Sequence, residues 1–134
     1  MNLDDNYHKL QPEIKHLHLN KDVIKQLKIG IDSDRNFKRY NNINELIQYS
    51  YRVAGCVGLI MCELMNIKDT EYKFHAIDLG IAMQLTNITR DIVEDKKRNR
   101  TYIKADFNSI RETIFLAEIF YRSSFPAIKN IPII

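Results

Sequence analysis

Residues 76–103 read A-I-D-L-G-I-A-M-Q-L-T-N-I-T-R-D-I-V-E-D-K-K-R-N-R-T-Y-I and decide the fold class. Apolar residues recur there at steps of three and four, which is the spacing of an amphipathic helix. The whole chain shows almost no strand-like alternation, and its 134 residues include only four glycines and three prolines. We therefore predict an all-α protein with short loops, in which about residues 73–99 form one helix.

One face of this predicted helix carries a row of polar side chains. At about 100° per residue, four of them fall within an arc of roughly 80°. The apolar residues Ile81, Leu85 and Ile88 lie beside that arc, so the row borders the buried side of the helix. The four polar residues are Gln84, Asn87, Asp91 and Asp95.

A bound divalent cation would explain why two acidic side chains lie in this row beside the buried side of the helix. Two carboxylates one helical turn apart repel each other by about 0.2–0.5 kcal/mol, and burial without a partner would cost far more. Mg²⁺ removes both costs, because it binds carboxylate, amide, water and phosphate oxygens. We interpret Asn87, Asp91 and Asp95 as its ligands, with Mn²⁺ as the alternative ion. The competing interpretation is a solvated acidic strip paired with the basic residues that follow.

A second apolar segment, residues 49–58, reads Y-S-Y-R-V-A-G-C-V-G. Helical spacing places Tyr49, Val53 and Val57 on one face. Each of its two glycines costs a helix about 1 kcal/mol relative to alanine. Either close packing of a neighbouring helix or the wall of an elongated apolar cavity explains them. A cavity beside a Mg²⁺ site suggests a prenyl diphosphate as ligand.

The remaining helix boundaries follow from capping signals. We expect the first well-defined helix to end near residues 37–38 and a short break at about residues 66–69. The predicted N-terminal caps are Asn20, either Asn42 or Asn44, Thr70, and Ser109 in a capping box that ends at Glu112.

Composition narrows the partners and the compartment. The net charge is +3, and the only basic cluster, residues 96–100, suits a solvated helix end, so we expect no nucleic-acid partner. Cys56 and Cys62 are predicted to be buried free thiols in a reducing compartment. The longest apolar stretch, residues 53–65, is too short for a membrane span. We predict a cytoplasmic protein and leave peripheral membrane contact open.

The two motifs, residues 49–61 and 76–103, resemble the central part of the squalene/phytoene synthases. The sequence G-I-A-M-Q-L-T-N-I-x-R-D within the second motif is most similar to the bacterial phytoene synthases. The resemblance runs from about residue 24 to 121. It implies the helical bundle of the isoprenoid (terpenoid) synthases. It also implies Mg²⁺-dependent, head-to-head condensation of two prenyl diphosphates in isoprenoid and carotenoid biosynthesis, with phytoene from geranylgeranyl diphosphate favoured.

The resemblance also implies roles for single residues. Asp91 and Asp95 match the acids of the second aspartate-rich motif, Asn87 matches a further metal ligand, and Arg90 matches the arginine of the motif's R-D pair. Asp34 stands where the family often has an acid before an R-Y pair. The matches to cavity and channel positions are Tyr49, Val53, Val57, Ala76, Leu79, Met83 and Gln84.

Some family features have no counterpart here. The first aspartate-rich motif is missing, since Asp4 and Asp5 have the wrong spacing, and the family continues for several helices beyond the equivalent of Pro132. We therefore interpret residues 1–134 as a single partial isoprenoid-synthase domain. Asn99 replaces the usual glycine, which asparagine can do because it tolerates the left-handed conformation of a helix end. Lys104 stands where a proline normally follows.

Two functions remain open. The chain is either a module of a prenyltransferase, with geranylgeranyl or farnesyl diphosphate as substrate, or a degenerate, non-catalytic member that serves as a binding or assembly module. Retention of the second acidic motif favours the enzyme. We expect this chain alone to be inactive or very weak, and we leave open self-association or a complementing chain.

Overall fold

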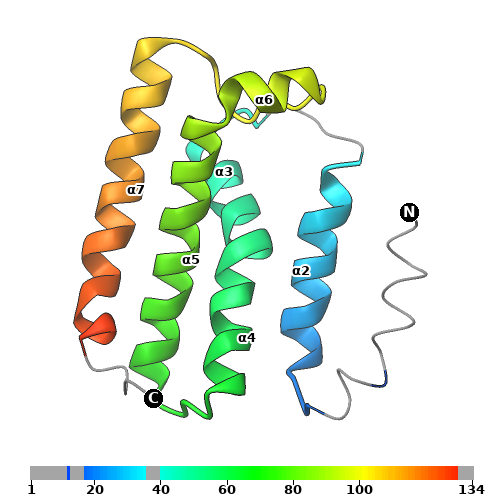
Figure 1. Cartoon of the computed structure of the whole chain (residues 1–134), viewed down its shortest axis with the longest axis vertical. Coiled ribbons are helices and arrows are strands. Elements are labelled where there is room, and N and C mark those ends of the chain that lie inside the picture. Colours follow the sequence, from blue (N-terminus) through cyan, green and yellow to red (C-terminus); the bar gives the residue numbers. More distant parts are fainter. Residues whose placement is uncertain (1–11, 13–16, 36–39, 130–134) are drawn as a thin grey trace.

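The computed structural model describes residue 12 and residues 17–35 and 40–129. All regular elements in this part of the chain are helices, which confirms the all-α prediction. Four helical rods run antiparallel to their neighbours, and α3, η1 and α4 together form one of them (Figure 1). The bounds are α2 Lys21–Ser33, α3 Ile43–Ser50, the π-helix η1 Tyr51–Gly55, α4 Cys56–Leu64, α5 Thr70–Arg90, α6 Ile92–Lys97 and α7 Phe107–Ile128.

Side-chain caps define four of the helix starts. Asn20 caps α2, as predicted, and Asn42 rather than the alternative Asn44 caps α3. The predicted caps Thr70 and Ser109 are wrong, because Asp69 caps α5 and Asp106 caps α7. In both cases the residue with extended backbone is an aspartate upstream, and its carboxylate accepts hydrogen bonds from N–H groups of the first turn. The helix α2 ends at Ser33, earlier than predicted, and the predicted end near residues 37–38 lies outside the described residues.

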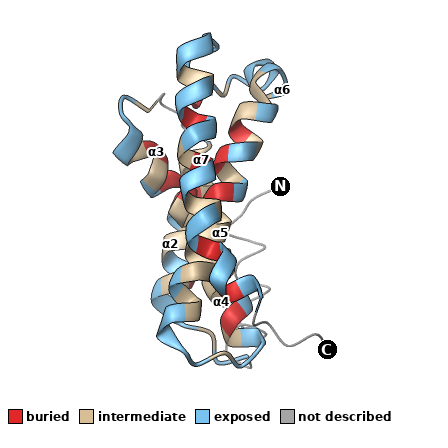
Figure 2. Ribbon diagram, turned by 90° about the vertical axis from the view of Figure 1, so that its left-hand side faces the viewer, coloured by how far each residue is buried: buried red, intermediate tan, exposed pale blue. Residues whose placement is uncertain are grey.

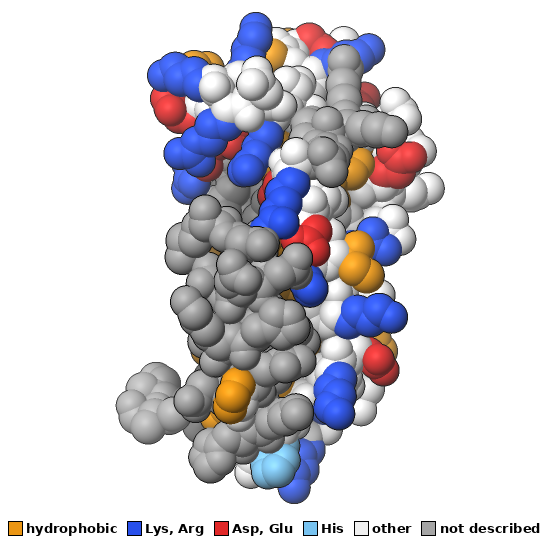
Figure 3. All heavy atoms as spheres, turned by 90° about the vertical axis from the view of Figure 1, so that its right-hand side faces the viewer, with side chains coloured by type: hydrophobic (Ala, Val, Ile, Leu, Met, Phe, Trp, Pro, Cys, Tyr) orange, Lys and Arg blue, Asp and Glu red, His pale blue; other side chains and the backbone are white. Residues whose placement is uncertain are grey.

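The prediction of one helix over residues 73–99 is wrong as well. The chain leaves the helical path at Asp91, whose φ and ψ are −100° and 16°, and α6 then lies across the end of α5 (Figure 1). Beyond Asp91 the sequence is mostly charged and has no apolar stripe to hold it against the bundle. Lys96, Lys97 and Arg98 of this segment are exposed, and Lys and Arg side chains gather at one end of the molecule in Figure 3.

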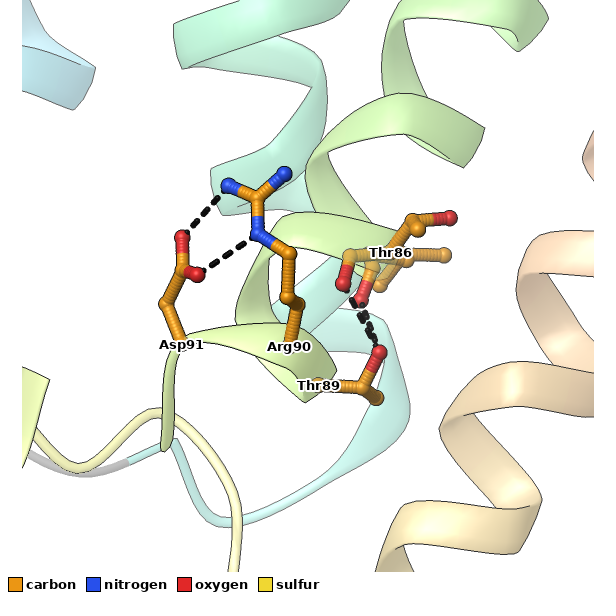
Figure 4. A network of polar contacts seen from close by, with 5 residues as sticks. Thr86, Thr89, Arg90 and Asp91 are labelled. Atoms are coloured by element: carbon orange, nitrogen blue, oxygen red, sulfur yellow. Dashed lines mark hydrogen bonds and ion pairs between the residues drawn. The ribbon is translucent and has the colours of Figure 1, made fainter. Parts of the chain in front are cut away.

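Threonine side chains weaken the end of α5 from within. The Thr89 hydroxyl donates to the Thr86 carbonyl at 2.8 Å (Figure 4), and the Thr86 hydroxyl donates to the Ala82 carbonyl. Such bonds back to a carbonyl three or four residues earlier tend to bend helices. The change of direction therefore needs neither glycine nor proline.

A compact turn follows α6. Asn99 has a φ of 59°, which confirms the left-handed conformation expected there. The Arg100 N–H donates to the Asp95 carbonyl at 2.9 Å, and the Asn99 N–H donates to the Lys96 carbonyl at 3.1 Å. This pair of bonds is the Schellman motif, and it reverses the chain rigidly toward Tyr102.

The core lies where α5 meets α3, α7 and the segment after α6. Ile81, Leu85 and Ile88, predicted to lie on the apolar side of α5, are buried, and Leu85 is fully enclosed. Figure 2 shows the buried residues along the inner helix faces. Cys56 and Cys62 are buried free thiols, as predicted. No described helix is long and apolar enough to cross a membrane.

Two glycines bring the central rods into backbone contact. A Cβ on Gly58 would overlap the Ala76 carbonyl, and a Cβ on Gly80 would overlap the Ala54 carbonyl. Of the two explanations left open for the glycines of residues 49–58, close helix packing is therefore confirmed at Gly58. The same contacts fix the register of the two antiparallel rods, with residue 58 beside 76 and residue 54 beside 80.

Candidate functional site

A groove of about 640 Å³ runs between α4, α5 and the last turns of α7. Its α5 wall extends from Tyr72 to Asn87 in steps of one and three residues, so every lining residue lies on one helix face. Asn87 lies fifteen residues beyond Tyr72, which corresponds to about 22 Å along the helix axis. The groove gathers six of the residues matched to cavity and channel positions, together with Asn87: Val53, Val57, Ala76, Leu79, Met83 and Gln84.

The groove has an apolar body between two polar ends, and Lys68, Asp69 and His75 line the end near the start of α5. The amides of Gln84 and Asn87 face it near the top of α5, and neither has a hydrogen-bond partner in the described part of the chain. Further down, the wall consists mainly of aliphatic and methionine side chains, and Met61 and Met83 are about half exposed. This volume and lining are typical of sites for elongated apolar ligands with a polar head.

Asp91 lies one turn beyond Asn87, at the break between α5 and α6. The Arg90 guanidinium donates to both carboxylate oxygens of Asp91, with Nε–Oδ1 and Nη2–Oδ2 distances of 2.7 Å (Figure 4). The Arg90 guanidinium lowers the pKa of the Asp91 carboxyl. Because the Arg90 side chain is 66% exposed, it can leave Asp91 for a more strongly charged partner.

Asp95 faces a different hollow, of about 250 Å³, which Ile88, Ile92, Arg100 and Tyr102 also line. Burial and then the charge of Asp91 raise the pKa of its carboxyl, and the charge of Asp34 acts in the same direction. The predicted unbroken row is therefore wrong: Gln84 and Asn87 face the groove, Asp91 sits at the turn, and Asp95 faces the hollow.

Tyr49 is absent from the groove wall, although Val53 and Val57 line it. The intervening residues 51–55 form the π-helix η1, whose wider i→i+5 turn changes the phase between Tyr49 and Val53. Tyr49 is 5% exposed, and its hydroxyl lies 3.1 Å from each carboxylate oxygen of Asp34. Sequence reasoning missed Tyr102 as a partner in this network, because it follows a turn that helical spacing cannot describe.

The oxygen donors at this end of the molecule are of the kinds that a hard divalent cation binds. Asn87, Asp91 and Asp95 offer one amide and two carboxylates. Burial and the charge of Asp91 raise the pKa of the Asp95 carboxyl, and the positive charges of Arg100 and Arg98 offset part of this effect. No three acidic, histidine or cysteine side chains of the described residues already converge on one point. Mg²⁺ needs only one or two carboxylates when phosphate and water oxygens complete its shell.

The solved crystal structure of squalene synthase HpnC from Alicyclobacillus acidocaldarius has the same fold. Its TM-score to this chain is 0.77 at 18% identity, and the match covers 94% of this chain and 56% of that one. This likeness confirms the predicted isoprenoid-synthase type of helical bundle.

Curated relatives match the central motifs. The 15-cis-phytoene synthase of Enterobacter agglomerans is 45% identical over 76 residues, which are 57% of this chain and 26% of the relative. The chloroplastic phytoene synthase 1 of Zea mays is 47% identical over 83 residues, covering 58% of this chain and 20% of the relative. The match thus spans about a quarter or less of each relative's length.

The family model described as squalene/phytoene synthase matches residues 4–132. This match includes both motifs, the groove and residues 91–95, which we call the acid-bearing turn. The chain therefore belongs to the squalene/phytoene synthase family, as its two motifs had indicated.

Proposed function

We propose that this chain carries one half of a head-to-head prenyltransferase site. A prenyl diphosphate would lay its tail along the groove and place its diphosphate near Asn87, Asp91 and Asp95. The observation that carries the proposal is the position of the groove's unpaired side-chain amides, which lie at the end of α5 that leads to the two aspartates. We propose geranylgeranyl diphosphate as substrate and phytoene as product.

Asn87, Asp91 and Asp95 would hold Mg²⁺, which when bound neutralises charge on the leaving diphosphate. Arg90 would turn from Asp91 to a phosphate, because a diphosphate is a stronger bidentate partner than one exposed carboxylate. This exchange frees both Asp91 oxygens for the cation. The apolar groove keeps water away from the allylic carbon once its bond to oxygen breaks.

In the full reaction, the C1–O bond of one prenyl diphosphate breaks and diphosphate leaves. The double bond of a second molecule attacks the resulting carbocation, and loss of a proton gives a cyclopropyl intermediate that retains one diphosphate. The groove described above accounts for one of the two tails. The non-catalytic alternative predicts that the chain binds a prenyl diphosphate but no protein containing it turns the ligand over.

Calorimetric titration with geranylgeranyl diphosphate tests the proposal. We expect binding with Mg²⁺ and at least tenfold weaker binding with EDTA. Asp91→Asn combined with Asp95→Asn should remove this metal dependence. Glu94→Gln is the matched control, because Glu94 lies between the two acids but is 65% exposed and pairs with Lys97. Equal affinity of the wild type with and without Mg²⁺ would refute the proposed site.

A further inference from the structure

Asp34 lies at the end of α2 and binds two tyrosines that are distant in the sequence. The Tyr102 hydroxyl donates to Asp34 Oδ1 at 2.7 Å, and the Tyr49 hydroxyl is 3.1 Å from both Asp34 oxygens and 3.3 Å from Tyr102 Oη. One carboxylate therefore joins α2, α3 and the segment that follows α6.

Packing holds this cluster in one arrangement. The rings of Tyr49 and Tyr102 stack with centroids 5.1 Å apart, and the Tyr40 ring lies 5.2 Å from Tyr49. Tyr49 and Tyr102 are 5% and 7% exposed. Burial raises the pKa of the Tyr102 hydroxyl to about 12, so it remains a hydrogen-bond donor at neutral pH. A buried polar cluster whose members satisfy one another rigidifies the segments it connects.

The cluster is coupled to the acid-bearing turn by a short, rigid path. Tyr102 lines the same hollow as Asp95 and Arg100. The Arg100 N–H donates to the Asp95 carbonyl, so the Schellman turn connects Asp95 to the segment that carries Tyr102 two residues later. The charge of Asp34 also acts on Asp95.

We propose that Asp34 is a positioning residue, which fixes Asp95 through Tyr102 at the place where a diphosphate-bound metal ion would lie. This inference rests on the proposed function. Asp34 itself touches neither the groove nor the ion; it sets the orientation of a ligand. Outer residues that orient metal ligands typically change metal affinity by about 10–100-fold when they are replaced.

Electron paramagnetic resonance of Mn²⁺ with inorganic diphosphate tests this role in the whole chain. We expect Asp34→Asn and Tyr102→Phe each to weaken Mn²⁺ binding by at least about tenfold and to change the line shape of the bound ion. Tyr102→Phe is the milder variant, because it keeps the ring and removes one hydroxyl, so it keeps the test valid if Asp34→Asn fails to fold. Thermal melts verify folding.

Tyr40→Phe is the matched control, since the Tyr40 hydroxyl interacts with Ser33 while its ring stacks with the Tyr102 ring. It should leave Mn²⁺ affinity and line shape unchanged. Wild-type affinity in folded Tyr102→Phe, or an equal loss in Tyr40→Phe, would overturn the positioning role alone. A wild-type chain that binds no Mn²⁺ with diphosphate would instead overturn the proposed function and this inference with it.

Discussion

The surroundings of Asp95 disfavour the ionised form of its carboxyl group. Burial and the neighbouring charges of Asp91 and Asp34 raise the pKa of its carboxyl. The folded chain therefore holds this proton more tightly than the unfolded chain, and the stability that Asp95 contributes is lost as pH rises through its raised pKa. Carboxyl groups with a shifted pKa, which lower the stability of the ligand-free protein, are typical of functional sites.

Asp95→Asn should stabilise the metal-free protein at pH 7. Removal of the repulsion from Asp91 contributes about 0.5 kcal/mol, which corresponds to about 2 °C in melting temperature. Circular dichroism melts should show this gain at pH 7 and a smaller one at pH 4, where the wild-type carboxyl holds its proton more often. Glu94→Gln should melt like the wild type. A lower melting temperature for Asp95→Asn at pH 7 would contradict this assignment.

The pair of Arg90 and Asp91 illustrates what residue patterns leave out. Consecutive residues do not face each other on a continuous helix, so helical spacing gave no reason to expect their bidentate contact. The contact exists because the backbone leaves the α-conformation at Asp91. The identities of the acids could be predicted from the sequence, whereas their orientation depended on this break.

At the scale of elements, the register of the α3–η1–α4 rod against α5 depends on Gly58 and Gly80. These contacts align Val53 and Val57 with the α5 wall of the groove. The sequence was sufficient to predict this apolar wall, because helical spacing is preserved within each rod. It was insufficient for Tyr49, since no residue pattern identified residues 51–55 as a π-helix.

Gly58→Ala should destabilise the protein although alanine is the better helix former. The favourable propensity of about 1 kcal/mol is opposed by overlap with the Ala76 backbone, and overpacking of this kind costs about 1–3 kcal/mol.

Gly55→Ala is the matched control for this substitution. Its Cβ would meet side-chain atoms of Tyr51 and Ile77 at 2.9 and 3.2 Å, and side chains yield more easily than backbone. Urea denaturation should therefore show a larger loss for Gly58→Ala. An increase in the free energy of unfolding for Gly58→Ala would refute the backbone contact.

At the scale of the whole molecule, α5 connects the two parts of the site, because it forms one wall of the groove and ends at the acid-bearing turn. The amphipathic patterns were sufficient to predict an all-α protein but not all of its helix boundaries, and the two motifs were sufficient to predict the family. The division of the polar row between groove and hollow required the structure, because it results from α6 crossing the end of α5. The basic side chains near α6 (Figure 3) lie at the same end, where they would favour the approach of the proposed diphosphate ligand.

Methionine methyl groups provide internal markers of direction along the groove. Met83 is one helical turn from Asn87, about 6 Å along the axis. The register set by Gly58 places Met61 level with residue 73 and Met65 level with residue 69, which are about 21 and 27 Å from Asn87 along α5. All three line the groove, and the chain has one other methionine, Met1.

The most direct test of the central claim is a ¹³C-methyl NMR spectrum of the methionines with geranylgeranyl diphosphate, recorded with Mg²⁺ and then with Mn²⁺ as a paramagnetic replacement. We predict that the ligand shifts the signals of Met61, Met65 and Met83, and that Mn²⁺ broadens Met83 strongly, Met61 weakly and Met65 least. Unshifted signals, or broadening that is strongest at Met65, would contradict a prenyl tail lying in this groove with its diphosphate at Asn87, Asp91 and Asp95.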